Sequence, residues 1–187
     1  MISERLAGIL LDSFWKILLP GLTMTIPLTA VAFSLAMVIA AAAALVQFAR
    51  IRVLTQLARF YIWVARGTPL LVQLFVVFYG LPRVGVTIEP FPAAVIVFSL
   101  NEGAYCAEIV RAALESVPPG QLEAGYCVGM TWWQTMRRIV LPQAMRTAFP
   151  SLSNSLIAMV KDTSLAANIT VAEMFMATQR IVARTFE

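Results

Sequence analysis

The sequence contains one long stretch without a charged residue, from Ile17 to Ala49. A transmembrane helix needs about 20 consecutive apolar residues to cross the hydrocarbon core of a bilayer, so this stretch is long enough for one crossing. The rest of the chain is similar, because 60% of its 187 residues are hydrophobic and only 13% are charged. A soluble domain of this size cannot bury so much apolar surface. We therefore expect an all-α polytopic membrane protein.

Four membrane spans are expected. Residues 1–16 form an amphipathic lead-in, and residues 17–187 form the membrane domain. The first span lies within Ile17–Ala49, with Pro20 and Pro27 near its start or at a kink. The others are Phe60–Leu81, Phe91 to about Ala107 and Ala148 to about Ala167, with a short loop at Leu81–Pro92 and an amphipathic helix at Asn168–Glu187.

The second span allows two interpretations. Thr68 can cap a helix from Pro69 to Tyr79, which would rise only about 16 Å, half a bilayer. A membrane helix broken in this way often directs backbone groups at a substrate. Alternatively, an ordinary helix begins at the interface and the Arg66 side chain reaches back to the headgroups. The second interpretation is favoured, because one proline-containing pair is little evidence for a break.

The longest polar interruption of the chain is the segment Val117–Pro142. Pro118 and Pro119 suit the start of a helix, where a missing N–H costs nothing. Gly129 is expected to end that helix, because glycine tolerates the left-handed conformation of a helix cap. The segment therefore predicts a helical hairpin, which we place within residues 115–142.

The second helix of this hairpin is expected to begin after Thr131, with Gln134 completing a capping box. Pro142 should disturb the end of that helix. The hairpin would expose apolar side chains beside charged ones, which is typical of a docking surface for another protein. These side chains are Leu122, Tyr126, Trp132 and Trp133.

Three motifs resemble the permease subunits of ATP-binding-cassette (ABC) importers. The first is Glu123-Ala124-Gly125, followed after three residues by Gly129 and after nine more by Ile139-Val140-Leu141-Pro142, which resembles the cytoplasmic coupling loop. The family usually has a second alanine where this chain has Gly125. The segments Arg66–Leu74 and Lys161–Leu165 resemble the polar amino acid branch, with cystine-type permeases nearest. The resemblance covers about Leu22 to Glu187.

The resemblance implies the type I importer permease fold (MetI-like), which usually has a fifth span. The sequence stops at Glu187, where that span would begin, so a truncated chain is expected. It also implies a second permease subunit, identical or related, two ATPase subunits and an external solute-binding protein. The chain would translocate polar amino acids, L-cystine included, by alternating access across the bacterial cytoplasmic membrane, without breaking a bond in the solute. Coupling to the ATPase would fall on Glu123, Ala124, Gly125, Gly129, Ile139, Leu141 and Pro142.

The sequence has no phosphate-binding loop of the type Gly-x-x-x-x-Gly-Lys-Ser/Thr and no histidine. ATP and Mg²⁺ are therefore expected on the partner ATPase subunit, and we expect neither enzymatic activity nor a bound cofactor or metal in this chain. Cys106 and Cys127 are interpreted as small apolar side chains.

The distribution of basic residues predicts the orientation. Alternate loops on one side hold eight arginines and those on the other side hold five basic residues, and the richer side should be cytoplasmic. The amino terminus would then lie outside and the hairpin inside. The eight are Arg50, Arg52, Arg59, Arg66, Arg111, Arg137, Arg138 and Arg146, and the five are Arg5, Lys16, Arg83, Arg180 and Arg184.

Charged residues inside predicted spans are costly and usually functional. Glu102 and Lys161 lie about 16–20 Å into their spans, near the bilayer centre, and could meet the ammonium and carboxylate of an amino acid. Alternatively, Lys161 and Asp162 pair with neighbours and fix the fourth helix in place. The candidate pathway residues are Asn101, Glu102, Tyr105, Gln73, Lys161, Asp162, Thr163 and Ser164.

Two other classes of protein compete with this interpretation. A stand-alone secondary transporter or channel subunit would need no long hairpin with exposed tryptophans, and its transport would ignore ATP. An intramembrane enzyme is disfavoured by the lack of histidine, of metal-ligand clusters and of a nucleophile beside a base.

Overall fold

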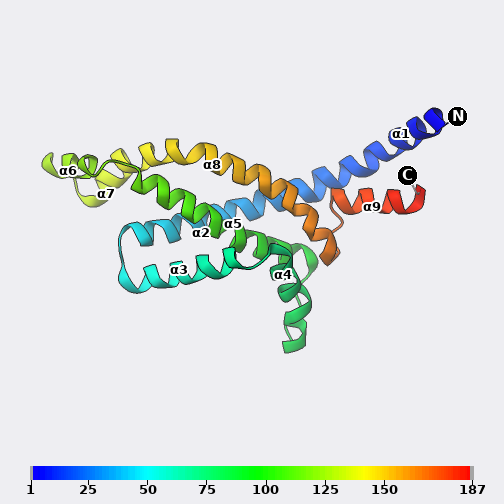
Figure 1. Cartoon of the computed structure of the whole chain (residues 1–187), viewed down its shortest axis with the longest axis horizontal. Coiled ribbons are helices and arrows are strands. Elements are labelled where there is room, and N and C mark those ends of the chain that lie inside the picture. Colours follow the sequence, from blue (N-terminus) through cyan, green and yellow to red (C-terminus); the bar gives the residue numbers. More distant parts are fainter. Residues whose placement is uncertain (1, 186–187) are drawn as a thin grey trace. The chain divides into compact units, whose positions relative to one another are not determined.

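The computed structural model describes residues 2–185, and these residues form helices and connecting turns without a strand. The α-helices are α1 (Ile2–Pro20), α2 (Ile26–Phe48), α3 (Arg52–Gly67), α4 (Leu70–Phe75), α5 (Pro90–Glu115), α6 (Pro119–Cys127), α7 (Trp132–Thr135), α8 (Leu141–Asp162) and α9 (Met174–Thr185) (Figure 1). Wider π-helical turns occupy Gly21–Thr25, Val76–Gly80 and Met136–Val140, and tighter 3₁₀ turns occupy Leu81–Val84 and Thr163–Ile169.

The chain folds into two compact units. The first unit comprises Met1–Ala32, Pro69–Phe98 and Ala158–Glu187, and the second comprises Phe33–Thr68 and Ser99–Ile157.

Each of the three π-helical turns comes just before a proline. Proline lacks an N–H group and its ring crowds the carbonyl four residues earlier, so a wider turn relieves the crowding while the helix continues. In each case the residue before the proline donates its N–H five residues back. The three bonds are Ile26 to Gly21 before Pro27, Leu81 to Val76 before Pro82, and Leu141 to Met136 before Pro142.

The π-helical turn before Pro142 explains why this proline does not end the helix, contrary to the expectation from the sequence. The sequence predicts a short second hairpin helix whose end is disturbed by this proline. Instead, the helix that begins at Trp132 passes through the π-helical turn and continues to Asp162.

The first predicted span is part of a longer helix. The helical run does not break at residue 16, so the lead-in and the first span are continuous, and Ala7–Phe48 alone has 42 residues. At 1.5 Å per residue this run is about 63 Å long, roughly twice the hydrocarbon thickness of a bilayer.

Two helices in the described residues are long and apolar enough to cross a membrane, Ala7–Phe48 and Pro90–Glu115. A third crossing is reached if α3 and the segment Leu70–Val84 count as one broken span. The fourth predicted span corresponds to α8, which carries Lys161 and Asp162 at its end and stops five residues before the predicted Ala167. The fourth span therefore stays a prediction.

The favoured interpretation of the second span as one ordinary helix is wrong. Helix α3 stops at Gly67, and Thr68 and Pro69 have extended backbones with ψ of 135° and 136°. The next helix begins at Leu70 with Pro69 as its N-cap, so the predicted cap at Thr68 is one residue too early. The Thr68 hydroxyl donates to the Val64 carbonyl at 2.9 Å. The backbone is broken here because the residue before a proline avoids helical angles.

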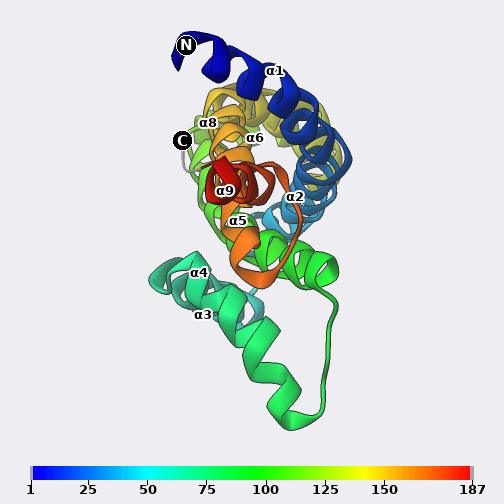
Figure 2. The same ribbon diagram turned by 90° about the vertical axis from the view of Figure 1, so that its right-hand side faces the viewer.

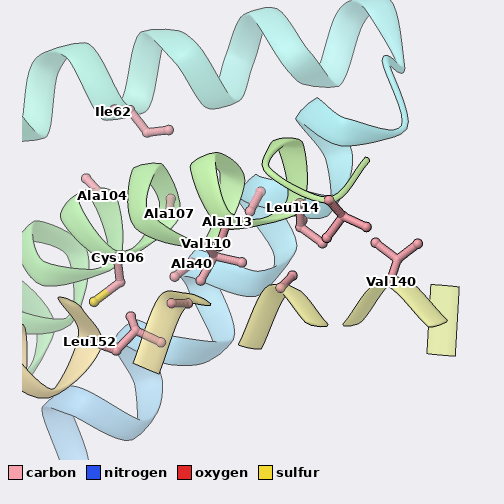
Figure 3. Close-up of a cluster of buried hydrophobic side chains, with 14 of the residues drawn as sticks. Ala40, Ile62, Ala104, Cys106, Ala107, Val110, Ala113, Leu114, Val140 and Leu152 are labelled. Atoms are coloured by element: carbon pink, nitrogen blue, oxygen red, sulfur yellow. The ribbon is translucent and has the colours of Figure 1, made fainter. Parts of the chain in front are cut away.

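In the second unit, small residues bring the helices close together. Ala40 on α2 and Ala104 and Ala107 on α5 have no exposed surface (Figure 3). Ala44 on α2 is equally buried. A Cβ added at Gly103 would lie 3.0 Å from Cγ2 of Ile39. Close backbone packing of small residues is what drives helix association in lipid, where hydrophobic burial supplies little. The core is completed by larger side chains of α3, α5 and α8, including Ile62, Leu114 and Leu152.

In the first unit, α1 and α9 lie side by side (Figure 1). Helix α9 begins six residues after the predicted start at Asn168, because the buried Glu173 carboxylate caps it. Both carboxylate oxygens of Glu173 accept, from the N–H groups of Phe175 and Met176, each at 2.7 Å. Residues 186–187 of the predicted amphipathic helix lie outside the described residues. The loop from Gly85 to α5 is the thin green connection in Figure 2 and is shorter than predicted.

Candidate functional site

The first hairpin helix, α6, ends as the sequence predicts. Gly129 has φ of +76°, a left-handed conformation that favours glycine. Around it, the N–H of Met130 donates to the Gly125 carbonyl at 3.0 Å and the N–H of Gly129 donates to the Tyr126 carbonyl at 2.9 Å. These bonds satisfy the last carbonyls of α6, so the reversal of the chain is fixed by local backbone bonding.

The predicted capping box is confirmed at the start of α7. The Gln134 N–H donates to the Thr131 hydroxyl at 3.3 Å, and the Thr131 N–H donates to the Gln134 side-chain oxygen at 2.9 Å. Two donors at the helix start are satisfied reciprocally. The two hairpin helices therefore have well-defined ends on both sides of Gly129.

The two helices of the hairpin meet at Gly125. A Cβ built on Gly125 would lie 2.6 Å from both Cγ2 and Oγ1 of Thr135, which has no exposed surface. Gly125 is one of the predicted coupling residues. It is buried, and Thr135 of the same hairpin occupies the space beside it, so its lack of a side chain serves the packing of the hairpin.

The outer face of the hairpin carries exposed aromatic and aliphatic side chains. The Trp133 side chain is 59% exposed, and its ring stacks on Trp132 with centroids 6.0 Å apart. Tyr126 and Val128 are also exposed, whereas Leu122 is only half-buried rather than exposed as predicted. Of the other predicted coupling residues, Glu123, Ala124, Gly129 and Pro142 are exposed, and Ile139 and Leu141 are half-buried.

Asn101 ties α5 to the end of α3. Its buried side-chain amide donates to the Ala65 carbonyl at 3.0 Å. In a continuous helix this carbonyl would accept from the N–H of residue 69, which is Pro69 and has none. The break in the second span therefore explains why a polar residue is placed at this position of α5. The Tyr61 hydroxyl makes a similar link by donating to the Leu100 carbonyl.

We expect Asn101→Leu to destabilise the second unit by about 1–2 kcal/mol, because a hydrogen bond to a buried backbone carbonyl is lost. The measurement is the thermal unfolding midpoint of the purified protein in detergent. Ser153→Ala is the matched control, because the Ser153 hydroxyl bonds only within its own helix, to the Phe149 carbonyl. An unchanged midpoint for Asn101→Leu would contradict the role assigned to this bond.

Glu102 and Tyr105 follow on the same helix. Glu102 is 8% exposed and accepts from the Cys106 thiol at 3.4 Å. Tyr105 is exposed, and the Arg66 guanidinium lies 5.0 Å from the centre of its ring.

A chain of charges continues toward the end of α5. Arg66 lies 4.0 Å from Glu108, and Glu108 pairs with Arg111, three residues later on the same helix, at 2.8 Å. Arg111 also pairs with Glu115 at 2.8 Å. A cavity of about 450 Å³ opens beside these charges, between α5 and residues Thr147 and Ser151 of α8. Arg66 was not predicted as a site residue, although its position one turn before the break was a usable signal.

The remaining candidate pathway residues lie in the first unit. Gln73 on α4, Asp162 and Ser164 are half-buried, Lys161 is exposed, and Thr163 is buried with its hydroxyl on the Val160 carbonyl at 2.6 Å. Within the described part of the chain, neither Lys161 nor Asp162 forms an ion pair. The structure thus groups Asn101, Glu102 and Tyr105 in the second unit and the other five in the first unit.

Residues 32–186 match the family of binding-protein-dependent transport system inner membrane components. The chain belongs to this family. It is a membrane-embedded permease subunit of an ABC importer, as the three sequence motifs predict.

Individual relatives support the same family. The chain is 51% identical over 176 residues to the L-cystine transport system permease protein TcyB of Bacillus subtilis, covering 94% of this chain and 75% of that protein. It is 44% identical over 169 residues to the probable amino-acid ABC transporter permease protein PatM of Vibrio harveyi, with 89% of this permease and 75% of that protein covered.

The predicted permease fold is confirmed by solved structures. A crystal structure of an amino acid ABC transporter with histidines matches with a TM-score of 0.86 and 34% identity, covering 95% of this chain and 83% of that one. The MetNI methionine ABC transporter matches with a TM-score of 0.69 over 82% of this chain and 74% of that one. At 21% identity, this second likeness concerns the fold alone.

Proposed function

We propose that this permease carries polar amino acids, L-cystine among them, into the cell in response to ATP hydrolysis on a separate subunit. The observation that carries the proposal is the hairpin of α6 and α7, whose exposed side chains include two stacked tryptophans, Trp132 and Trp133, as well as Glu123 and Ala124. A movement of the hairpin caused by a partner protein can be transmitted to α8, because the helix that begins at Trp132 continues into α8 without a break. The names of the relatives support the substrate class.

The complete transporter would contain a second permease, two ATPase subunits that hold ATP and Mg²⁺, and an external solute-binding protein. Five or fewer spans in one chain are too few to enclose a conduit, which supports pairing with a second permease. The basic residues around the hairpin support a cytoplasmic position for it and an external amino terminus. Closure of the ATPase dimer would then move the hairpins and switch the side on which the pathway is open.

Glu102 is proposed to line the pathway and to meet the ammonium group of the solute, with Lys161 meeting the carboxylate. The burial of the Glu102 carboxylate within an apolar helix supports this role, since such a charge is costly without a function. Glu102→Gln keeps the shape and removes the charge, so we expect uptake to fall about tenfold or more while the subunits still assemble, as for a lost charge-assisted hydrogen bond. Wild-type uptake by this variant would refute the role.

The function is tested by uptake of radiolabelled amino acids in cells that carry or lack this chain. We expect uptake of L-cystine or another polar amino acid only in cells with the chain, and competition by unlabelled amino acids should rank the substrates. Reconstituted vesicles should lose uptake when ATP is withheld. Uptake that continues without ATP, or without the hairpin, would instead indicate a stand-alone transporter.

A further inference from the structure

A cavity of about 440 Å³ lies at the turn between α2 and α3, within the second unit. Three arginines line it, Arg50, Arg52 and Arg59, together with the polar side chains of Gln47, Thr55 and Gln56 and the carboxylate of Glu115. Neither the transport mechanism nor the coupling hairpin uses this cavity. Its chemistry is that of a site for an anion.

Within the part of the chain that the structure describes, the arginines of the cavity are not held in ion pairs by carboxylates of the protein. The one carboxylate in the lining, Glu115, is engaged by Arg111 through contacts of 2.8 and 3.0 Å. The cavity therefore keeps an excess of positive charge.

The start of α3 lies at the same cavity. Its N-cap is Ile51, whose side chain cannot accept a hydrogen bond, and its first turn has no acidic residue. The first N–H groups of a helix and the positive end of its dipole favour an anion. Arg52, the first residue of α3, lines the cavity, so the positive end of the helix lies beside the guanidinium groups.

The backbone of Arg50 is in a conformation that its residue type disfavours. Arg50 has φ of +55°, and it closes the end of α2 with bonds from Arg50 N–H to Gln47 O and from Ile51 N–H to Val46 O. This is the helix-end position at which glycine is most common. A residue other than glycine in this left-handed conformation destabilises the fold by about 1 kcal/mol. Such a conformation is kept where the side chain has a function.

The position of the cavity along the chain indicates the kind of anion. Helix α2 ends at Phe48, at the end of the stretch Ile17–Ala49 that has no charged residue, and Arg50 and Arg52 follow directly. The turn therefore lies where a span leaves the hydrocarbon. Lipid phosphates lie at this depth, and basic pockets between membrane helices bind lipid headgroups.

We propose that this cavity binds the phosphate of an anionic phospholipid headgroup through Arg50, Arg52 and Arg59. Such a lipid would hold the α2–α3 turn at the membrane surface, beside Leu114 and Leu122 at the base of the hairpin, which line a neighbouring cavity that shares Gln47, Arg50 and Glu115. The proposal rests on membership of a membrane-protein family and is independent of the transported solute.

The test is a native mass spectrometry titration of the full chain, purified within its transporter complex, with phosphatidylglycerol and with phosphatidylcholine of the same acyl chains. We expect tighter binding of phosphatidylglycerol. Each of Arg50→Gly, Arg52→Gln and Arg59→Gln should raise the dissociation constant of phosphatidylglycerol about fivefold, the usual effect of one basic residue near an anionic membrane surface. The triple variant should raise it about a hundredfold, because three such effects combine. Arg146→Gln is the matched control, since Arg146 is exposed on α8 and does not line the cavity.

Arg50→Gly separates a binding role from a structural one. Glycine adopts the left-handed conformation of residue 50 without strain, so the unfolding temperature should stay the same or rise. Lipid affinity should fall, because the guanidinium group is lost. Unchanged phosphatidylglycerol affinity in the triple variant, or an equal loss in Arg146→Gln, would overturn the proposal. So would equally tight binding of inorganic phosphate, which would identify a soluble anion, or loss of ATPase assembly with lipid affinity intact, which would identify a protein contact.

Discussion

Gly125→Ala is expected to abolish most ATP-coupled uptake, although it adds only one methyl group. The new Cβ would lie 2.6 Å from two atoms of Thr135, a separation that side chains do not tolerate. Helices α6 and α7 must then move apart, at a cost of about 1–3 kcal/mol for an overpacked site. This movement displaces the exposed side chains that a partner would bind. Uptake in vesicles with ATP and copurification of the ATPase subunit measure the effect, and we expect a decrease of about tenfold or more in each, as 1.4 kcal/mol corresponds to tenfold.

A second substitution should restore the hairpin. Thr135→Ala removes Cγ2 and Oγ1, so the closest remaining atom of residue 135 is its Cβ, 3.1 Å from the position of the new methyl group. Thr135→Ala alone should cost about 1 kcal/mol, since the Thr135 hydroxyl donates to the Thr131 carbonyl at 3.1 Å. The double variant should be more active than Gly125→Ala, which is the sign of direct contact in a double-mutant cycle. Additive losses would mean that Gly125 faces the partner after all. Permeases of this family usually have alanine at this position, so the double-mutant cycle also tests whether residue 135 is what makes glycine necessary in this chain.

Trp133→Ala is expected to weaken the complex with the ATPase subunit by about 2 kcal/mol or more, which is about thirtyfold in affinity. Its side chain is 59% exposed in the isolated chain and stacks only on Trp132, so it has little role in holding the hairpin together. Large exposed aromatic side chains are the residues that carry most binding energy once a partner covers them. Binding of the purified ATPase subunit to the permease in nanodiscs measures the loss.

Trp63→Ala supplies the matched control for Trp133→Ala. Trp63 is 72% exposed on α3, where it contacts Phe60, and it belongs to a predicted membrane span rather than to the hairpin. ATPase affinity should therefore stay within about twofold of wild type, the scale of a substitution away from the interface. Equal weakening by both substitutions would show that Trp133 acts through general destabilisation.

The hairpin was predictable in detail because its signals are local. Gly129 and the Thr131–Gln134 pair specify backbone conformations within a few residues, and the structure has both. Two other features of the hairpin were not predicted. Nothing in the sequence around Gly125 indicates that Thr135 fills the space beside it, and nothing around Pro142 shows that a π-helical turn lets the helix continue.

The candidate pathway was less predictable for the same reason. Charge inside an apolar run drew attention to Glu102 and Lys161, but the hydrogen bond from Asn101 to Ala65 joins residues far apart in the sequence. The break in the second span was not predictable either, since the sequence shows a proline but not which group donates a hydrogen bond to the freed Ala65 carbonyl. Only the position of α5 beside the end of α3 supplies that donor.

The sequence by itself determined that this chain is helical, apolar enough for a membrane, and equipped with the motifs of an ABC importer permease. Those properties depend on composition, on local turn chemistry and on spacing along the chain. Tertiary structure alone decided that Gly125 serves the packing of its own hairpin, that Asn101 stabilises the break after α3, and that three arginines surround one cavity. The physical reason is that each of these depends on which helices lie side by side, and that is set by close packing of small residues such as Ala40, Ala104 and Gly103 rather than by any local preference.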